Sequence, residues 1–137
     1  MAVTIDGSAG VTTNAGGSVN PSTNVDGINY SCRAWVNFNG TGTVAINASG
    51  NVTSITDNGT GDYTVNLTTA MSDINYSVGL MGNGAYTVSR NCYPAIFTNI
   101  SAATEVAPTT SAFRVGFANA AGSAGQDLKY ICVSVFR

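Results

Sequence analysis

The chain has 137 residues, a formal net charge of −2 and no histidine, and only 9% of its residues are charged. Without histidine there can be no Ser-His-Asp triad, no Cys-His pair and no histidine metal ligand. Thr, Gly, Asn and Ser supply most of the polarity, whereas strong helix formers are scarce. The length therefore suits one domain, and the composition predicts an all-β fold.

The basic residues are spread along the sequence and form no basic stretch: Arg33, Arg90, Arg114, Lys129 and Arg137. Binding to nucleic-acid phosphates needs clustered Lys and Arg, so we expect no nucleic-acid partner. No apolar run approaches the ~20 residues of a transmembrane helix, so we expect no membrane partner. The N-terminus lacks the basic and apolar parts of a signal peptide, which predicts a protein made in the cytoplasm.

Residues 1–30 differ in composition from the rest of the chain. Met1–Ile5 could form one short strand, and a run of small polar residues up to Pro21 follows it. Four glycines interrupt this run, namely Gly7, Gly10, Gly16 and Gly17. Such a stretch buries little apolar surface alone, so we predict a flexible N-terminal arm or tether. The arm is either a disordered tail or a segment that orders against a neighbouring subunit.

Residues 31–137 show strand patterns every 8 to 12 residues, as is typical of a sandwich or barrel. The predicted strands, in chain order, are Arg33–Asn39, Thr43–Ala48, Asn51–Thr56, Asp62–Thr68, Tyr76–Leu80, Tyr86–Asn91, Ala95–Ile100, Phe113–Phe117 and Lys129–Arg137. About nine strands in one domain indicate an antiparallel, jelly-roll-like β-sandwich.

Glycine and asparagine mark the turns between these strands, because both tolerate a positive φ. Asp57–Gly61 is the clearest hairpin loop, and Gly40–Gly42 and Gly82–Gly84 are two further turns. Longer loops are predicted over residues 101–111 and over Asn119–Gly125.

The final strand is apolar on both faces, which is typical of a central strand between two packed layers. Alternation along this and earlier strands predicts a buried core. Its members are Trp35, Phe38, Val65, Leu67, Val115, Phe117, Cys132, Val133 and Val135. Trp35 shares its strand face with Asn37, so the alternative is that Trp35 faces a neighbouring subunit.

The chain has three cysteines, Cys32, Cys92 and Cys132. An odd number argues against a secreted disulfide framework. Cys132 lies between Ile131 and Val133, where a free cysteine packs as a small apolar group. The alternative is one disulfide together with one free thiol.

Two runs, AWVNFNGTGTVAI (Ala34–Ile46) and NVTSITDNGTGDYTVNLTTAMSDINYSV (Asn51–Val78), resemble a segment common in virion proteins of tailed bacteriophages. Tail fibre proteins are prominent among these. The opening VTIDGSAGVTT (Val3–Thr13) is also similar to the start of such fibre proteins. The resemblance implies a homotrimeric virion structural protein, made in the host cytoplasm and placed on the virion surface.

Candidate catalytic and metal-binding residues are few. Asp57 and Asp62 flank the predicted hairpin loop and could form the carboxylate pair of a glycosidase, which lies across a cleft. A hairpin loop offers no cleft, so we interpret both as turn-capping residues. The same loop could offer oxygen ligands to Ca²⁺, but it lacks the regular acidic spacing of a calcium loop. We therefore expect no catalytic, cofactor or metal site.

Six aromatic residues could stack on sugars while Asn and Thr bind the hydroxyl groups. These are Tyr30, Trp35, Tyr63, Tyr76, Tyr86 and Tyr93. Tyr and Trp are also favoured in cores and at subunit contacts, and we prefer that interpretation.

Three functions compete at this point. The preferred one is a non-enzymatic structural virion module, either a tail fibre or appendage or a capsid decoration protein. It would bind itself as a homotrimer and other virion proteins through the N-terminal arm. The alternative is a tip protein that binds a host receptor or surface glycan, and the third is a depolymerase.

Overall fold

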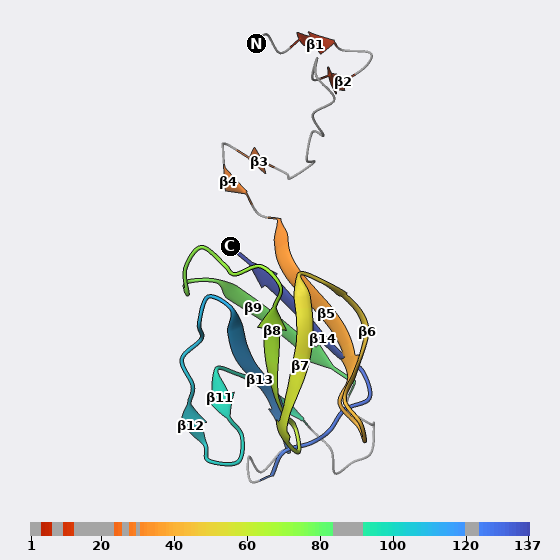
Figure 1. Cartoon of the computed structure of the whole chain (residues 1–137), viewed down its shortest axis with the longest axis vertical. Coiled ribbons are helices and arrows are strands. Elements are labelled where there is room, and N and C mark those ends of the chain that lie inside the picture. Colours follow the sequence, from red (N-terminus) through yellow and green to blue (C-terminus); the bar gives the residue numbers. More distant parts are fainter. Residues whose placement is uncertain are drawn as a thin grey trace. The chain divides into compact units, whose positions relative to one another are not determined.

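The computed structural model describes residues 31–83, 92–119 and 124–137 in full (Figure 1). Within residues 1–30 it gives the backbone of four short strands, β1 (Thr4–Asp6), β2 (Gly10–Thr12), β3 (Asn24–Val25) and β4 (Ile28–Asn29). They pair as two antiparallel ladders, β1 with β2 and β3 with β4. The chain divides into two compact units, Met1–Ser31 and Cys32–Arg137. The predicted arm otherwise lies outside the described residues.

The second unit is built from strands, and its described residues contain no helix. The strands are β5 (Cys32–Asn39), β6 (Ala45–Gly50), β7 (Val52–Gly59), β8 (Asp62–Leu67), β9 (Ser77–Gly82), β10 (Tyr93–Ile96), β11 (Thr98–Asn99), β12 (Thr104–Glu105), β13 (Ala112–Ala118) and β14 (Ile131–Phe136). They match the predicted strands to within a few residues, except that the predicted strand Tyr86–Asn91 lies outside the described residues.

Eight of these strands form two four-stranded antiparallel sheets (Figure 1). Sheet I has the order β6-β5-β14-β9 and sheet II the order β10-β13-β8-β7. β5 and β14, the first and last strands of the unit, lie side by side in the middle of sheet I. The predicted all-β antiparallel sandwich is confirmed. The predicted loop over residues 101–111 contains the short strand β12, which pairs with β11 to form a small hairpin.

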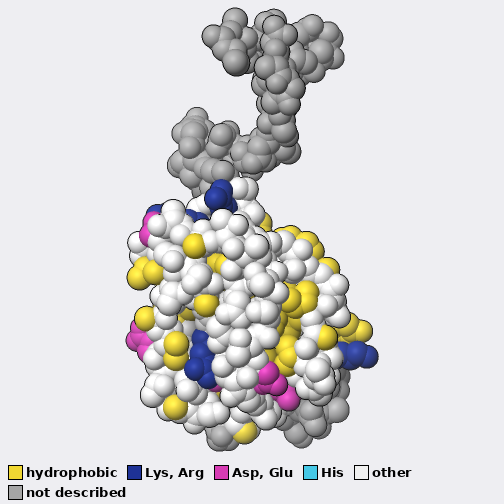
Figure 2. Space-filling model, viewed as in Figure 1, with side chains coloured by type: hydrophobic (Ala, Val, Ile, Leu, Met, Phe, Trp, Pro, Cys, Tyr) yellow, Lys and Arg dark blue, Asp and Glu magenta, His cyan; other side chains and the backbone are white. Residues whose placement is uncertain are grey.

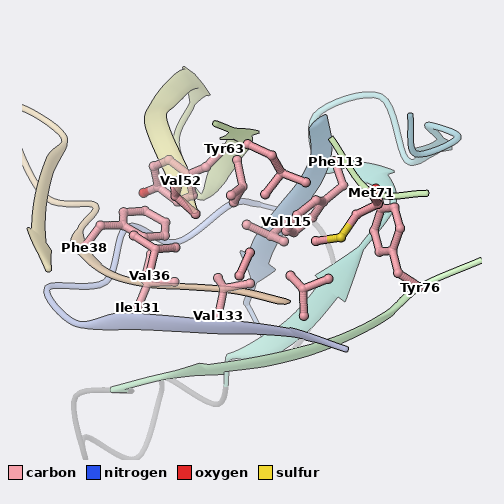
Figure 3. Close-up of a cluster of buried hydrophobic side chains, with 14 of the residues drawn as sticks. Val36, Phe38, Val52, Tyr63, Met71, Tyr76, Phe113, Val115, Ile131 and Val133 are labelled. Atoms are coloured by element: carbon pink, nitrogen blue, oxygen red, sulfur yellow. The ribbon is translucent and has the colours of Figure 1, made fainter. Parts of the chain in front are cut away.

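The inner faces of the two sheets supply the core, as Figure 3 shows. Phe38 of sheet I and Tyr63 of sheet II meet edge to face, with ring centroids 5.2 Å apart. Seven of the nine predicted core residues are buried: Phe38, Val65, Leu67, Val115, Phe117, Val133 and Val135. Alternation predicted them correctly because every second side chain of a sandwich strand points inward.

The burial predicted for Trp35 and Cys132 is wrong. Trp35 is 45% exposed, and Cys132 is also exposed. β14 does lie in the middle of its sheet, as predicted, but within one chain only its inner face is covered. Cys132 and Phe136 alternate with buried residues and therefore point outward.

The β7–β8 turn has the predicted form, with positive φ at Gly59 and Gly61. Gly61 is also closely packed, since a Cβ built there would lie 2.5 Å from the carbonyl oxygen of Phe117. Its own carbonyl oxygen accepts a hydrogen bond from the Phe117 amide. The turn is therefore fixed against sheet II at a position where only glycine fits.

β10 ends earlier than predicted, at Ile96 rather than Ile100. Phe97 adopts a positive φ of 57° and turns the chain out of the sheet. Its amide still donates to the Arg114 carbonyl oxygen, while its own carbonyl oxygen accepts from Val106. Residues 97–106 consequently form an excursion that closes on itself beside β13.

Candidate functional site

The outer face of sheet I carries large exposed apolar side chains beside hydrogen-bonded asparagines, since Asn47 Nδ2 donates to Asn37 Oδ1 at 2.7 Å and Asn37 Nδ2 donates to Cys132 Sγ at 3.2 Å. Met81 of β9 is 75% exposed, Trp35 of β5 is 45% exposed and Phe136 of β14 is 42% exposed. Together with Cys132 these residues define what we call the apolar face. Tyr130, half-exposed directly before β14, continues the same alternation. Cys132 lies at the middle of the face, because β14 is a central strand.

Small residues separate the large ones on the apolar face. Ser134 of β14 pairs with Trp35 on one side and with Gly79 on the other. Trp35 pairs in turn with Gly50 of β6. A Cβ at Gly50 would lie 2.5 Å from Trp35 Nε1, so the missing side chain makes room for the indole ring. The face thus has large protruding side chains next to positions that carry small or no side chains.

Charge on the apolar face is confined to its margin. Among the outward-facing strand residues of sheet I, only Arg33 near the start of β5 is charged. Arg137, which follows β14, forms an ion pair with Asp73. This partner lowers the pKa of the Asp73 carboxyl and raises the pKa of the arginine. Lys129 Nζ lies 5.6 Å from the ring centroid of Tyr130.

The outer face of sheet II is polar along β7 and β8. Asn66 Nδ2 donates to Thr56 Oγ1 at 3.0 Å and lies 3.1 Å from Ser54 Oγ. Asn58 Nδ2 donates to Thr64 Oγ1 at 2.9 Å. We call this ladder of hydroxyl and amide side chains the polar face. In Figure 2 charged side chains occupy only a small part of the visible surface.

Asp62 is not an exposed turn residue, so its predicted role is wrong. The carboxylate is fully buried and accepts hydrogen bonds from Arg114 Nε at 2.6 Å and Arg114 Nη2 at 3.0 Å. It also accepts one from the Ile100 amide at 2.9 Å. Asp62 points to the outer side of β8, but the excursion of residues 97–106 covers it there. Asp57, in contrast, is exposed and caps the turn by accepting from the Gly59 amide, as predicted.

The two aspartates therefore do not form a carboxylate pair across a cleft. The Asp62 carboxylate accepts hydrogen bonds from the Arg114 guanidinium and the Ile100 amide, whereas Asp57 is exposed to solvent. Within the described residues, no group of three or more His, Cys, Asp or Glu side chains is placed to share a metal ion.

A second polar contact, which sequence analysis missed, lies at the end of the sandwich near the β7–β8 turn. Asp127 Oδ1 accepts from Tyr63 Oη at 2.7 Å and from the Gly61 amide at 2.7 Å. Tyr63 Oη is also 3.0 Å from the Gly40 carbonyl oxygen. Burial first, and then the neighbouring carboxylate, raises the pKa of the Tyr63 hydroxyl. These contacts join three loops.

The four candidate sugar-stacking aromatics that the structure describes do not gather in one place. Tyr63 and Tyr76 are buried, while Trp35 on sheet I and Tyr93 on sheet II are exposed. Tyr30 and Tyr86 lie outside the described residues. The interpretation as core residues is confirmed for Tyr63 and Tyr76.

The three cysteines, all in the described part of the chain, are free thiols. The alternative of a disulfide is therefore wrong for this structure. In the part of the chain that the structure describes, no helix is long and apolar enough to cross a membrane.

Comparison of the chain with protein-family models, curated proteins and solved structures found no match. The two unlike outer faces of the sandwich are consequently the main structural indication of function.

Proposed function

We propose that the chain is a non-enzymatic structural module of a tailed-bacteriophage virion. It acts as a homotrimeric surface component, either a tail fibre or appendage or a capsid decoration protein. The observation that carries the proposal is the contrast between the apolar face on sheet I and the polar face on sheet II. A sandwich of this kind can bury one face in an assembly and present the other to solvent.

The resemblance to phage fibre proteins supports the same reading. Its two runs, Ala34–Ile46 and Asn51–Val78, include most of β5 and all of β7 and β8. They therefore contribute to both sheets and to the core between them, through residues such as Phe38 and Tyr63. A resemblance over these strands concerns the folded body of the unit.

Buried polar groups serve the fold. Every buried side-chain nitrogen or oxygen of the described residues has a hydrogen-bond partner. Asp62 and Asp127 are both engaged with groups of the chain itself. Fully satisfied buried polar groups of this kind make a fold rigid, as a structural protein requires.

The test is to locate the protein on the particle. Antibody raised against the chain should label intact virions at regular positions in negative-stain images, on the tail or on the capsid surface. Labelling of lysate material alone, with unlabelled particles, would contradict the proposal.

The polar face favours one second candidate, a tip protein that binds a host surface glycan. Hydroxyl and amide groups of Thr56, Asn58 and Asn66 line up on it beside the partly exposed Arg114. Such groups can hydrogen-bond to sugar hydroxyls. Glycan-array binding that is lost in Asn66→Ala but kept in Trp35→Ala would favour this candidate.

A further inference from the structure

We infer that the apolar face of sheet I is the surface on which copies of this chain meet, so that Cys132 lies close to its counterparts on neighbouring subunits. This inference rests on the proposed homotrimer and assigns the interface within it. In a single chain, Met81, Trp35 and Phe136 are exposed by 75%, 45% and 42% on one sheet. Large apolar side chains gathered on one exposed sheet face mark a candidate interaction surface.

The charge pattern favours a second copy as the occupant. Around a threefold axis the residues nearest the axis lie close to their counterparts, so a charge at the centre of the face would oppose like charges. The centre of the apolar face carries none, and Arg33 lies near one end of β5. The nearby Arg137 is already paired with Asp73. A charged partner would find no complementary group at the centre of this face.

The alternation of large and small side chains on the face also suits self-association. Protruding Trp35 and Met81 side chains alternate with the low positions Gly79 and Ser134. Each copy therefore carries both large side chains and small-residue positions against which the large side chains of another copy could pack. Close packing of this kind is what distinguishes the buried centre of a stable interface.

The size of the face sets how sensitive the interface should be. Four strands about 4.8 Å apart and six residues about 3.4 Å apart cover roughly 400 Å² in projection. A standard interface buries about 800 Å² on each partner. Because the face is small, one charge placed on it should suffice to separate the subunits.

The first experiment compares matched charge substitutions by light scattering over a range of protein concentrations. Met81→Asp places a carboxylate on the apolar face, and Thr56→Asp places one on the polar face. Wild type and Thr56→Asp should have the mass of a trimer, whereas Met81→Asp should have the mass of a monomer. Unchanged circular dichroism and melting of Met81→Asp would show that the sandwich itself is intact. Should Met81→Asp fail to fold, Trp35→Asp gives the same comparison on β5.

The second experiment tests which surfaces face each other. In a Cys32→Ser/Cys92→Ser background, oxidation with diamide should link Cys132 to Cys132 of another copy. At a threefold axis only two of three thiols can pair, so a denaturing gel should show a cross-linked dimer plus monomer. The dimer should revert to monomer under reductant. The control removes Cys132 and adds Thr64→Cys on the polar face, and it should stay uncross-linked.

Any of four results would overturn the inference: a monomeric wild type, an unchanged trimer in Met81→Asp, a trimer without Cys132 cross-links, or cross-linking through Thr64→Cys and not through Cys132. A trimer without Cys132 cross-links would point to another occupant of the face, such as residues 1–30 of a neighbouring copy. None of these results affects antibody labelling of virions, so failure of the interface can be told apart from failure of the proposed function.

Discussion

Asp62 shows how much one buried carboxylate can contribute to this fold. It joins Arg114 of β13 and the amide of Ile100 to β8, and its side chain is fully enclosed. Removing it leaves a guanidinium and an amide without their partner. Asp62→Ala should therefore lower the free energy of unfolding by on the order of 3 kcal/mol.

Asp57 provides the matched control for that substitution, because it lies five residues away in the exposed turn. Asp57→Ala removes one solvent-exposed hydrogen bond to the Gly59 amide and should cost no more than about 1 kcal/mol. Urea denaturation of the two variants measures the difference. Equal losses would show that the Asp62–Arg114 pair contributes nothing beyond an ordinary surface contact.

Tyr63 should make the protein sensitive to alkali. Its pKa is raised above the ordinary 10.0 in the folded state, so the unfolded chain releases this proton first. The contribution of Tyr63 to stability should therefore be constant below about pH 10 and fall as the pH rises further, by at most about 1.4 kcal/mol per pH unit for each such tyrosine. Tyr76, whose pKa burial raises to about 12, adds to the same decline.

The experiment measures unfolding free energy between pH 8 and pH 11 for wild type, Tyr63→Phe and Tyr130→Phe. Tyr63→Phe should show a shallower alkaline decline, although it loses some stability at neutral pH with its bond to Asp127. Tyr130 is half-exposed, and Tyr130→Phe should follow wild type. An unchanged slope in Tyr63→Phe would contradict the prediction.

At the scale of turns, two glycines separate backbone strain from crowding. Gly42 and Gly61 both have positive φ, 66° and 69°. Nothing lies within 4 Å of a Cβ built at Gly42, whereas a Cβ at Gly61 would lie 2.5 Å from the Phe117 carbonyl oxygen. Gly42→Ala should cost about 1 kcal/mol from strain alone. Gly61→Ala should cost clearly more, and equal melting temperatures would contradict this reading of the turn.

At the scale of strands, the next prediction contrasts the inside and outside of the sandwich. Phe117 of β13 is 2% exposed, whereas Phe136 of β14 is 42% exposed. Phe117→Ala should cost roughly 3–5 kcal/mol of unfolding free energy because it opens a cavity. Phe136→Ala should cost the isolated subunit less than about 1 kcal/mol. Comparable losses, measured by urea denaturation of non-associating Met81→Asp protein, would mean that the inner and outer faces have been misassigned.

Alternation made most strands and the core predictable, because a period of two fixes which residues share a face. It does not say what covers that face. The pattern of β14 was apolar on both sides, yet only the side of Ile131, Val133 and Val135 is buried within the chain. Trp35 posed the same ambiguity, and its predicted alternative, a contact with a neighbouring subunit, is the one that the apolar face now favours.

Polar contacts were harder to foresee, because they join residues distant in the sequence. Asp62 meets Arg114 across 52 positions, and Tyr63 meets Asp127 across 64. The sequence around Asp62 predicts a turn residue, because the excursion that covers Asp62 comes almost 40 positions later. Only the spatial arrangement of β8, β13 and the loop before β14 reveals these partners.

For the whole molecule, the division of the chain at Cys32 suggests a division of work. Unit Cys32–Arg137 contains both sheets, the core and the apolar face, whereas Met1–Ser31 contributes two short ladders of its own. The two four-stranded sheets are built from strands of the second unit alone. The sandwich should thus fold without the first unit, and the first unit is available to act as the tether that we propose.

Deletion of residues 2–28 tests this division. The truncated chain should keep the β-sheet circular dichroism and cooperative melting of the full chain, since β5 begins only at Cys32. It should also keep its trimeric mass if the apolar face holds the subunits together. Incorporation into particles should be lost, because we propose that the deleted residues form the tether. A control in which a Gly/Ser linker of equal length replaces residues 2–28 separates the sequence of the arm from its length. Normal incorporation of the truncated protein would reduce the arm to a passive tail, and the attachment surface would then have to lie on the sandwich.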